Sequence, residues 1–304
     1  MRVPRVKQRF RLQDGRLMRI GGAHDALSAR LLAEAGFPAV WLSGFGLAAA
    51  QFAFPDINLV TMTESVEAAR RAAAAAGVPV IVDADNGFGD AKNVARAVKE
   101  YGQAAVAGLC MEDNIFPKRC SLYAGAPREL VSVREMCDKL EAARRAADPF
   151  GMFLIGRVES LIAGFGPEDA VVRAIAYAEA GADAILIHGC SFGPLREIAL
   201  SRRVPRPLVL VPTLFPDVSL AEVEACGFGA VIFANQLLRA AVHAARAMLG
   251  RLLRAGALTD VDGYLCSVAD VNRLVGVPED WDAPAGKPSK PASASGSACP
   301  QASV

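Results

Sequence analysis

The sequence of 304 residues lacks the features that would assign it to several large classes of protein. No stretch approaches the ~18 consecutive apolar residues that suggest a membrane span, and the basic first ten residues, MRVPRVKQRF, lack the apolar core of a secretion signal. An excess of one charge is also missing, since the chain has 33 Lys and Arg and 32 Asp and Glu. It has no basic tail that would bind nucleic acid or an anionic membrane. We therefore expect a cytoplasmic protein whose partner is a small molecule.

Cysteine and histidine are scarce. The seven cysteines include no CxxC pair, and such an odd set is typical of reduced thiols in a cytosolic protein. Only Cys120 is treated below as a candidate for function. Of the three histidines, His24 and His243 lie in helical sequence and are expected to be structural. His188 follows three apolar residues, a position that suits a buried core histidine as well as a functional one.

Apolar residues make up 53% of the chain and charged residues 21%, which is enough for a large buried core. Eight apolar runs of strand length alternate with helical sequence, and this pattern predicts an α/β protein with a (β/α)8 TIM-type barrel, which typically takes about 250 residues. A doubly wound open sheet is the competing architecture, but it seldom needs so many units. The expected strands are 17–22, 38–43, 78–84, 107–112, 153–158, 184–188, 208–212 and 230–234, and expected helices include 25–35, 63–76, 91–104, 131–146 and 167–180.

The composition changes near the end of the chain. From Ala283 onward Pro, Ser, Ala and Gly dominate, and these residues offer little to bury in a core. We therefore expect one catalytic barrel domain over residues 1–282 and a disordered tail over 283–304.

Several of the expected strands end in acidic residues. Asp83 and Asp85 stand two positions apart at the end of one strand, so both lie on the same face. Glu112 ends the next strand, and the C-terminal ends of the strands meet on one face of a barrel. Three carboxylates supply hard oxygen ligands, so we predict a Mg²⁺ site, or a Mn²⁺ site. The alternative is that Asp85 caps a helix and forms a surface turn.

Two potential anion-binding residues end the following strands. Arg157 can hold a phosphate or a carboxylate through two parallel hydrogen bonds, and His188 ends the neighbouring strand. The alternative role of Arg157 is a salt bridge to Glu159 or Glu112, and the two roles are compatible. Weaker candidate donors, in loops after two other strands, are Ser43, Gly44 and Thr213.

These motifs together resemble the isocitrate lyase and phosphoenolpyruvate mutase superfamily, most closely its phosphoenolpyruvate mutase and phosphonopyruvate hydrolase branch. The resemblance covers residues 24–275. No single motif is specific, but the combination is. The motifs are WLSGFG from Trp41, DADNGFGD from Asp83, MEDNIFPKRCS from Met111, RVESLIAGFG from Arg157 and GADAILIH from Gly181.

The resemblance implies a (β/α)8 barrel whose last helix is exchanged between subunits of a homo-oligomer, a dimer or a dimer of dimers. It implies that Asp83 binds Mg²⁺ directly, while Asp85 and Glu112 reach the metal through water. It also implies a substrate-binding set and a set close to the reacting phosphorus or the lid of the site. The first set is Trp41, Ser43, Gly44, Phe45, Ser121 and Glu159; the second is Asp56, Lys118, Cys120, Arg157 and His188.

The expected lid differs from the pattern of this branch. Mutases resemble K-x-N-S at this point and hydrolases K-x-T-S, whereas this chain has Lys118-Arg119-Cys120-Ser121. Carbon–carbon lyases of the superfamily resemble K-[KR]-C-G-H, with the cysteine as acid/base. We favour a phosphoenolpyruvate mutase, which interconverts phosphoenolpyruvate and phosphonopyruvate. The alternatives are a phosphonopyruvate hydrolase, or a Mg²⁺-dependent lyase or hydrolase that cleaves a carbon–carbon bond of a 2-oxo or malate-type acid. A binding subunit without activity is disfavoured because the acidic set is complete.

Overall fold

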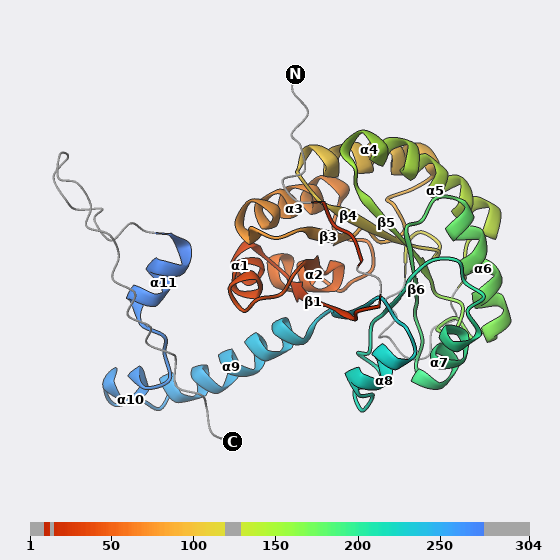
Figure 1. Ribbon diagram of the computed structural model, residues 1–304. Coiled ribbons are helices and arrows are strands. Elements are labelled where there is room, and N and C mark those ends of the chain that lie inside the picture. The colour runs from red at the N-terminus through yellow and green to blue at the C-terminus, as the bar shows by residue number, and fades with distance from the viewer. Residues whose placement is uncertain (1–8, 13–14, 119–128, 277–304) are drawn as a thin grey trace. The chain divides into compact units, whose positions relative to one another are not determined.

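The computed structural model describes residues 9–12, 15–118 and 129–276. The chain forms two compact units, Met1–Val261 and Asp262–Val304. The first unit contains a closed barrel of eight parallel strands, in which each strand pairs with its neighbours in sequence and β8 pairs with β1 (Figure 1). The barrel prediction is confirmed, and the open sheet is excluded. The strands are β1 (Met18–Ala23), β2 (Val40–Leu42), β3 (Val80–Asp83), β4 (Gly108–Glu112), β5 (Phe153–Val158), β6 (Ala184–Ile187), β7 (Leu208–Leu210) and β8 (Ala230–Phe233).

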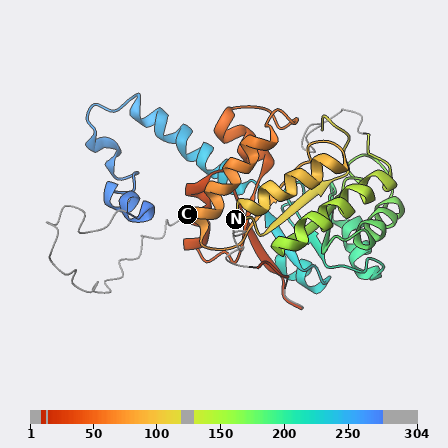
Figure 2. The ribbon, with the colours of Figure 1, turned by 90° about the horizontal axis from the view of Figure 1, so that it is seen from above.

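Helices lie around the outside of these strands (Figures 1 and 2). Two helix starts differ from the sequence prediction. Gly44, expected in a loop, begins a helix because the Ser43 side chain accepts a hydrogen bond from Gly46 N and caps it. The next helix begins at Met62, with Thr61 as its cap and Glu64 completing a capping box. The helices of the barrel are α1 (Ala26–Glu34), α2 (Gly44–Phe52), α3 (Met62–Ala76), α4 (Ala91–Gln103), α5 (Val133–Ala147), α6 (Pro167–Glu179), α7 (Phe192–Ser201) and α8 (Leu220–Ala225), with a 3₁₀ turn at Asp148–Phe150.

The core has two apolar layers because successive strand residues point to opposite faces. One layer fills the barrel, with Ile81 of β3, Ile155 of β5 and Leu186 of β6 among its members. The other layer lies between the strands and the helices, where Val82 and Leu154 pack against the alanine-rich faces of the helices. Apolar filling leaves only the ends of the barrel for polar groups, so chemistry is restricted to the loops that follow the strands.

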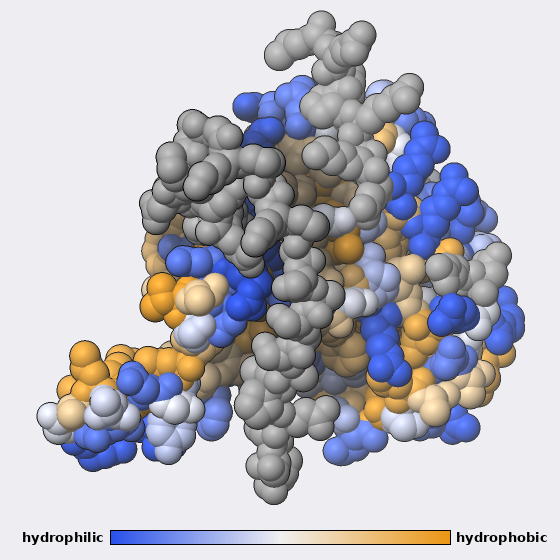
Figure 3. All heavy atoms as spheres, turned by 60° about the vertical axis from the view of Figure 1, so that its left-hand side comes forward, coloured by the Kyte–Doolittle hydropathy of each residue, from blue (hydrophilic) through white to orange (hydrophobic). Residues whose placement is uncertain are grey.

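The helix after the last strand differs from the others. α9 (Gln236–Leu252) has no buried residue, although its sequence is strongly amphipathic. The remaining helices are α10 (Thr259–Asp262) and α11 (Val268–Val275). Apolar side chains lie among hydrophilic ones on the surface shown in Figure 3. On α9 the large exposed apolar side chains are Val242, Leu249 and Leu252. Within the described ranges, no helix has both the length and the apolar character needed to cross a membrane.

Candidate active site at the C-terminal ends of the strands

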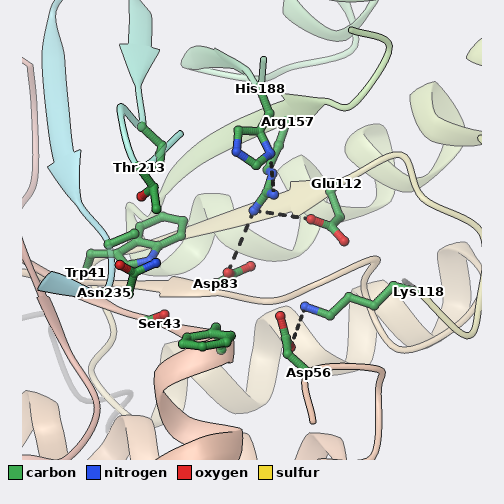
Figure 4. Close-up of a pocket in the computed structure, with 13 residues that line it drawn as sticks. Trp41, Ser43, Asp56, Asp83, Glu112, Lys118, Arg157, His188, Thr213 and Asn235 are labelled. Atoms are coloured by element: carbon green, nitrogen blue, oxygen red, sulfur yellow. Dashed lines mark hydrogen bonds and ion pairs between the residues drawn. The ribbon is translucent and has the colours of Figure 1, made fainter. Parts of the chain in front are cut away.

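A pocket opens at the C-terminal ends of the strands (Figure 4). Its cavity measures about 60 Å³ and is lined mainly by polar and charged side chains. Ten residues that the sequence nominated for binding or catalysis line this pocket. Its lining residues are Trp41, Ser43, Phe45, Asp56, Asp83, Glu112, Lys118, Arg157, His188, Val211, Thr213, Ala234 and Asn235.

Strand register brings the predicted acidic residues together. Asp83 pairs with Cys110 of β4, two residues before Glu112, and Glu112 pairs with Arg157 of β5. Asp83 and Asp85 also converge on the start of α2. A Cβ added to Gly44 would lie 3.5 Å from Asp83 Oδ2 and 3.1 Å from Asp85 Oδ1. The glycine therefore lets the backbone approach both carboxylates closely.

Burial makes these carboxylates hard to ionise. The pKa of Asp85 is raised to about 6, mainly by burial and further by Asp83, while Lys118 opposes the rise. The pKa of Glu112 is raised to about 8, again mainly by burial, with Arg157 opposing. Such shifts are frequent at functional sites, because binding of a cation or an electrophilic substrate relieves the unfavourable charge.

Arg157 joins the acids to His188. Its Nη1 lies 3.3 Å from Glu112 Oε2 and 3.9 Å from Asp83 Oδ2. Dashed lines in Figure 4 mark these two ion pairs. Its Nε donates to Glu159 Oε1 at 2.5 Å, so the salt bridges that the sequence offered as an alternative role are present. Burial alone would lower the pKa of Arg157, but Glu159 and Glu112 raise it well above its usual value. The guanidinium stays charged at any pH at which the protein is folded.

His188 is fixed by the same group of side chains. Its Nδ1 lies 3.0 Å from both Glu159 Oε1 and Arg157 Nη2. Nδ1 donates to Glu159 when it carries the proton and accepts from Arg157 when it does not. Glu159, nominated for substrate binding, is 0% exposed and does not line the pocket; it contacts Arg157 and His188 instead.

A buried network fixes the backbone behind this group. Asp113, which the sequence places beside Glu112, accepts a hydrogen bond from Glu159 N at 2.9 Å. Its other oxygen accepts from Tyr177 OH at 2.7 Å and Arg173 Nη1 at 3.2 Å. Burial raises the pKa of Asp113 to about 6, although these donors oppose the rise. Adjacent acids on one strand therefore have different partners: Glu112 faces the pocket and Asp113 the supporting network.

Lys118 occupies the other side of the pocket. Its side chain is 4% exposed, and its ammonium lies 2.8 Å from Asp56 Oδ1. Figure 4 marks this ion pair. The ammonium also forms a short ion pair with Asp85. Burial alone would lower the pKa of Lys118, but Asp85 and Asp56 raise it well above its usual value. The next two residues nominated from the sequence, Cys120 and Ser121, lie outside the described residues.

The donor set fits a hard divalent cation held partly through water. Within the described residues, no three Asp, Glu, His or Cys side chains form a group compact enough to bind a metal ion directly. Asp83 and Asp85 nevertheless converge beside Gly44, and Glu112 is linked to Asp83 through Arg157. Magnesium commonly keeps several of its waters and uses only one or two protein carboxylates, so a dispersed set suits it.

The structure adds residues that the sequence pattern did not nominate. Asn235 lies two residues after the end of β8 and lines the pocket together with Thr213. Asn235 Oδ1 and Thr213 Oγ1 are buried and have no hydrogen-bond partner in the described part of the chain. Asn235 could have been predicted from the sequence, because polar residues at the ends of barrel strands face one pocket and Asn235 follows the last expected strand. No comparable signal marked Asn58, whose amide contacts Asp85 from a loop.

Comparison with known proteins places this pocket in a defined family. The model of the phosphoenolpyruvate phosphomutase family matches residues 10–253. The chain is 42% identical to the phosphonopyruvate hydrolase of Variovorax sp. (strain Pal2) over 271 residues, which cover 88% of this chain and 93% of the relative.

Solved structures agree with the sequence match. The crystal structure of a phosphoenolpyruvate phosphomutase from Streptomyces platensis subsp. rosaceus superposes with a TM-score of 0.84 at 40% identity, covering 88% of this chain and 93% of that one. A phosphonopyruvate hydrolase in complex with oxalate and Mg²⁺ superposes with a TM-score of 0.79 at 40% identity, covering 86% and 91%. The chain therefore belongs to the phosphoenolpyruvate phosphomutase family, within the isocitrate lyase and phosphoenolpyruvate mutase superfamily of enzymes.

Proposed function

We propose that this enzyme is a Mg²⁺-dependent phosphoenolpyruvate mutase. The observation that carries the proposal is one small pocket in which Asp83 and Glu112 lie beside the Arg157–His188 pair. Asp85 does not line this pocket but pairs with Lys118, which does. The acids suit a cation that binds the carboxylate and enolate oxygens of a pyruvyl group. The cationic pair suits a phosphoryl or phosphonyl group at the other end of the same small substrate.

The proposed reaction is an isomerisation. The carbon–phosphorus bond of phosphonopyruvate breaks, an oxygen–phosphorus bond forms, and phosphoenolpyruvate results without gain or loss of atoms. Asp83, Asp85 and Glu112 would hold the magnesium ion, which would supply stabilisation of the negative charge on the enolate oxygen. A loosely bound phosphoryl group needs positioning and charge stabilisation more than covalent help, and Arg157, His188 and Lys118 are placed to provide both.

Ser43 and Phe45 have a role in the same proposal. They stand at the start of α2, where unpaired backbone N–H groups favour an anion, and both line the pocket together with Trp41. We assign the substrate carboxylate to this helix start, under the Trp41 ring. Asp56 lies beside Lys118 on the side of the transferring phosphorus.

Phosphonopyruvate hydrolysis is the second candidate. The 42% identity to a phosphonopyruvate hydrolase over nearly the whole chain favours it. In that reaction water attacks the phosphorus, and phosphonopyruvate plus water gives pyruvate and inorganic phosphate. The two reactions share the substrate and differ in whether water reaches the phosphoryl group. A carbon–carbon lyase that uses Cys120 as acid/base is the third candidate, supported by the resemblance of the KRC segment and of FPDINLVTMTE from Phe54.

Phosphorus NMR separates these functions. The purified enzyme is incubated with phosphonopyruvate and Mg²⁺, because the mutase equilibrium of this family favours phosphoenolpyruvate. A phosphoenolpyruvate signal is expected. A signal of inorganic phosphate with release of pyruvate would establish the hydrolase instead, and an unchanged substrate would exclude both and direct the test to 2-oxo and malate-type acids.

The proposal includes a homo-oligomer in which the helix after the barrel packs on another subunit. α9 carries Val242, Leu249 and Leu252 exposed to solvent, and none of its residues is buried within the single chain. An amphipathic helix of this length needs an apolar surface to cover it. Light scattering of the purified protein should give the mass of a dimer or a tetramer. A monomer at micromolar concentration would contradict the proposed assembly.

A further inference from the structure

Asn58 holds an unusual position between two parts of the pocket. It lies in the loop between α2 and α3 and has a left-handed backbone with φ of 61°. Asn is one of the few residues other than glycine that adopts this conformation readily. The side chain is half-buried, although it belongs to a loop.

Both ends of the Asn58 amide are used. Nδ2 donates to Asp85 Oδ2 at 3.3 Å. Oδ1 accepts from the backbone N of Lys118 at 2.5 Å and from Asn86 Nδ2 at 3.2 Å. One amide therefore joins the loops that follow β2, β3 and β4.

These contacts close a ring of interactions with the Lys118 side chain. Asn58 holds Lys118 at its backbone, while the Lys118 ammonium pairs with Asp85 Oδ1 and Asp56 Oδ1. Asp85 is held in turn at its second oxygen by Asn58. Because the donor and the acceptor belong to one rigid amide, Asn58 fixes the distance between the Lys118 backbone and the Asp85 carboxylate.

The ring is anchored on buried scaffold. Asn86 is 1% exposed, and its Nδ2 also donates to the carbonyl of Ile115 at 3.1 Å. The carbonyl of Asn86 accepts from Lys139 Nζ at 3.3 Å, and Lys139 is itself buried on α5. Asn58 therefore fixes Lys118, which lines the pocket, and its ion-pair partner Asp85 relative to the buried scaffold.

We infer that Asn58 is a positioning residue that sets Lys118, which lines the pocket, and Asp85, which lies behind it, in a fixed relation to each other. A carboxamide suits this role because it donates and accepts without carrying charge. Aspartate would lose the donor and set a second negative charge against Asp85, and an apolar side chain would lose both bonds. The inference concerns the site of the proposed function and depends on that function only where activity is measured.

The test uses the chemical reactivity of Lys118, which does not require a known substrate. Asn58→Gly removes the amide and keeps the left-handed backbone. The full-length protein is treated with an amine-selective acylating reagent, and the rate of labelling at each lysine is measured by peptide mass spectrometry. Lys139 serves as a buried internal standard, and Gln51→Ala, which removes an exposed amide from α2, is the matched control.

We expect Lys118 to be labelled at least ~10-fold faster in Asn58→Gly, because loss of the bond to its backbone allows local opening. Lys139 and the Gln51→Ala control should be unchanged. The same variant should lose about 10-fold in kcat with KM altered less than ~3-fold, as for an interaction made mainly in the transition state. Labelling of Lys118 at the wild-type rate would overturn the inference.

Asn58→Asp tests the two bonds separately. The carboxylate still accepts from the Lys118 backbone, so labelling should stay close to wild type, while kcat falls because Asp85 is repelled. Labelling as fast as in Asn58→Gly would show that the acceptor atom does not hold Lys118. The two proposals can fail separately. If the wild-type enzyme converts phosphonopyruvate by neither reaction but Lys118 is labelled faster in Asn58→Gly, the role of Asn58 stands and the proposed function is wrong.

Discussion

The two sides of the pocket are built differently. On one side, Arg157 and Glu112 stand on adjacent strands whose register fixes them, and His188 follows the next strand. On the other side, Asp56 and Lys118 come from loops and are held by side-chain contacts such as the Asn58 amide. Strand register is set by the whole barrel, whereas a loop position depends on a few hydrogen bonds. We therefore expect the strand side to bind anions in a fixed geometry and the loop side to be the easier one to disturb.

The largest effect is expected from Asp83→Ala. Asp83 is the proposed direct ligand of magnesium, and loss even of groups that only support a metal ligand typically costs 10–100-fold in activity. Turnover should fall by more than ~100-fold while the melting temperature stays near that of the wild type. Chelator-treated wild-type enzyme should be equally inactive and recover with Mg²⁺. Full activity after removal of metal would disprove this role.

Arg157→Lys probes the strand side. Lysine keeps the charge but loses the planar fork that reaches Glu159, Glu112 and a bound anion together. We expect kcat/KM to fall at least ~10-fold, which corresponds to about 1.4 kcal/mol of transition-state stabilisation. A matched exposed change, Arg206→Lys, should have no effect. Unaltered kinetics in Arg157→Lys would show that the arginine only supports the fold.

The pH dependence of stability probes Glu112, the buried acid on the strand side of the pocket. The pKa of Glu112 is about 8 in the folded protein against an ordinary 4.5, so the folded state binds this proton more tightly than the unfolded state. The free energy of unfolding of the metal-free protein should therefore fall as pH rises from about 4.5 to 8. Glu112→Gln should flatten this slope in thermal melts.

Magnesium should change the same profile. Metal binds the ionised carboxylates, so the increase in melting temperature caused by Mg²⁺ should grow between about pH 6 and pH 8. These limits are the raised pKa values of Asp85 and Glu112. The effect should be smaller in Glu112→Gln. A stabilisation by Mg²⁺ that is independent of pH would mean that Glu112 does not titrate on metal binding.

The smallest effect is expected from Cys120→Asn, at a position outside the described residues. Asparagine stands at this point in the mutases that the chain resembles, so mutase activity should remain within ~5-fold of wild type if Cys120 only shapes the lid. Cys120→Ser is the matched control for loss of the thiol. A folded Cys120→Asn enzyme that binds Mg²⁺ but has no activity would identify the thiol as an acid/base and favour the lyase reaction.

The alternation of apolar runs and helical sequence was sufficient to predict the barrel, because period and length are local properties of a chain. The same alternation gave Asp83, Glu112, Arg157 and His188, since each lies within one residue of the end of a strand and strand ends converge on one face. The sequence did not reveal α2. Its start depends on a single serine cap, and its glycine- and alanine-rich residues give a weak helix signal.

Local sequence therefore determined which residues reach the open end of the barrel. Only the tertiary structure decided how they pair there. Glu112 and Asp113 are neighbours in sequence, yet one faces the pocket and the other the Arg173–Tyr177 network, because the barrel lies on one side of β4 and the helices on the other. Asn58 and Lys118 are 60 positions apart and meet through one hydrogen bond. Such a contact leaves no periodic trace in the sequence, since it exists only when the barrel brings separate loops together.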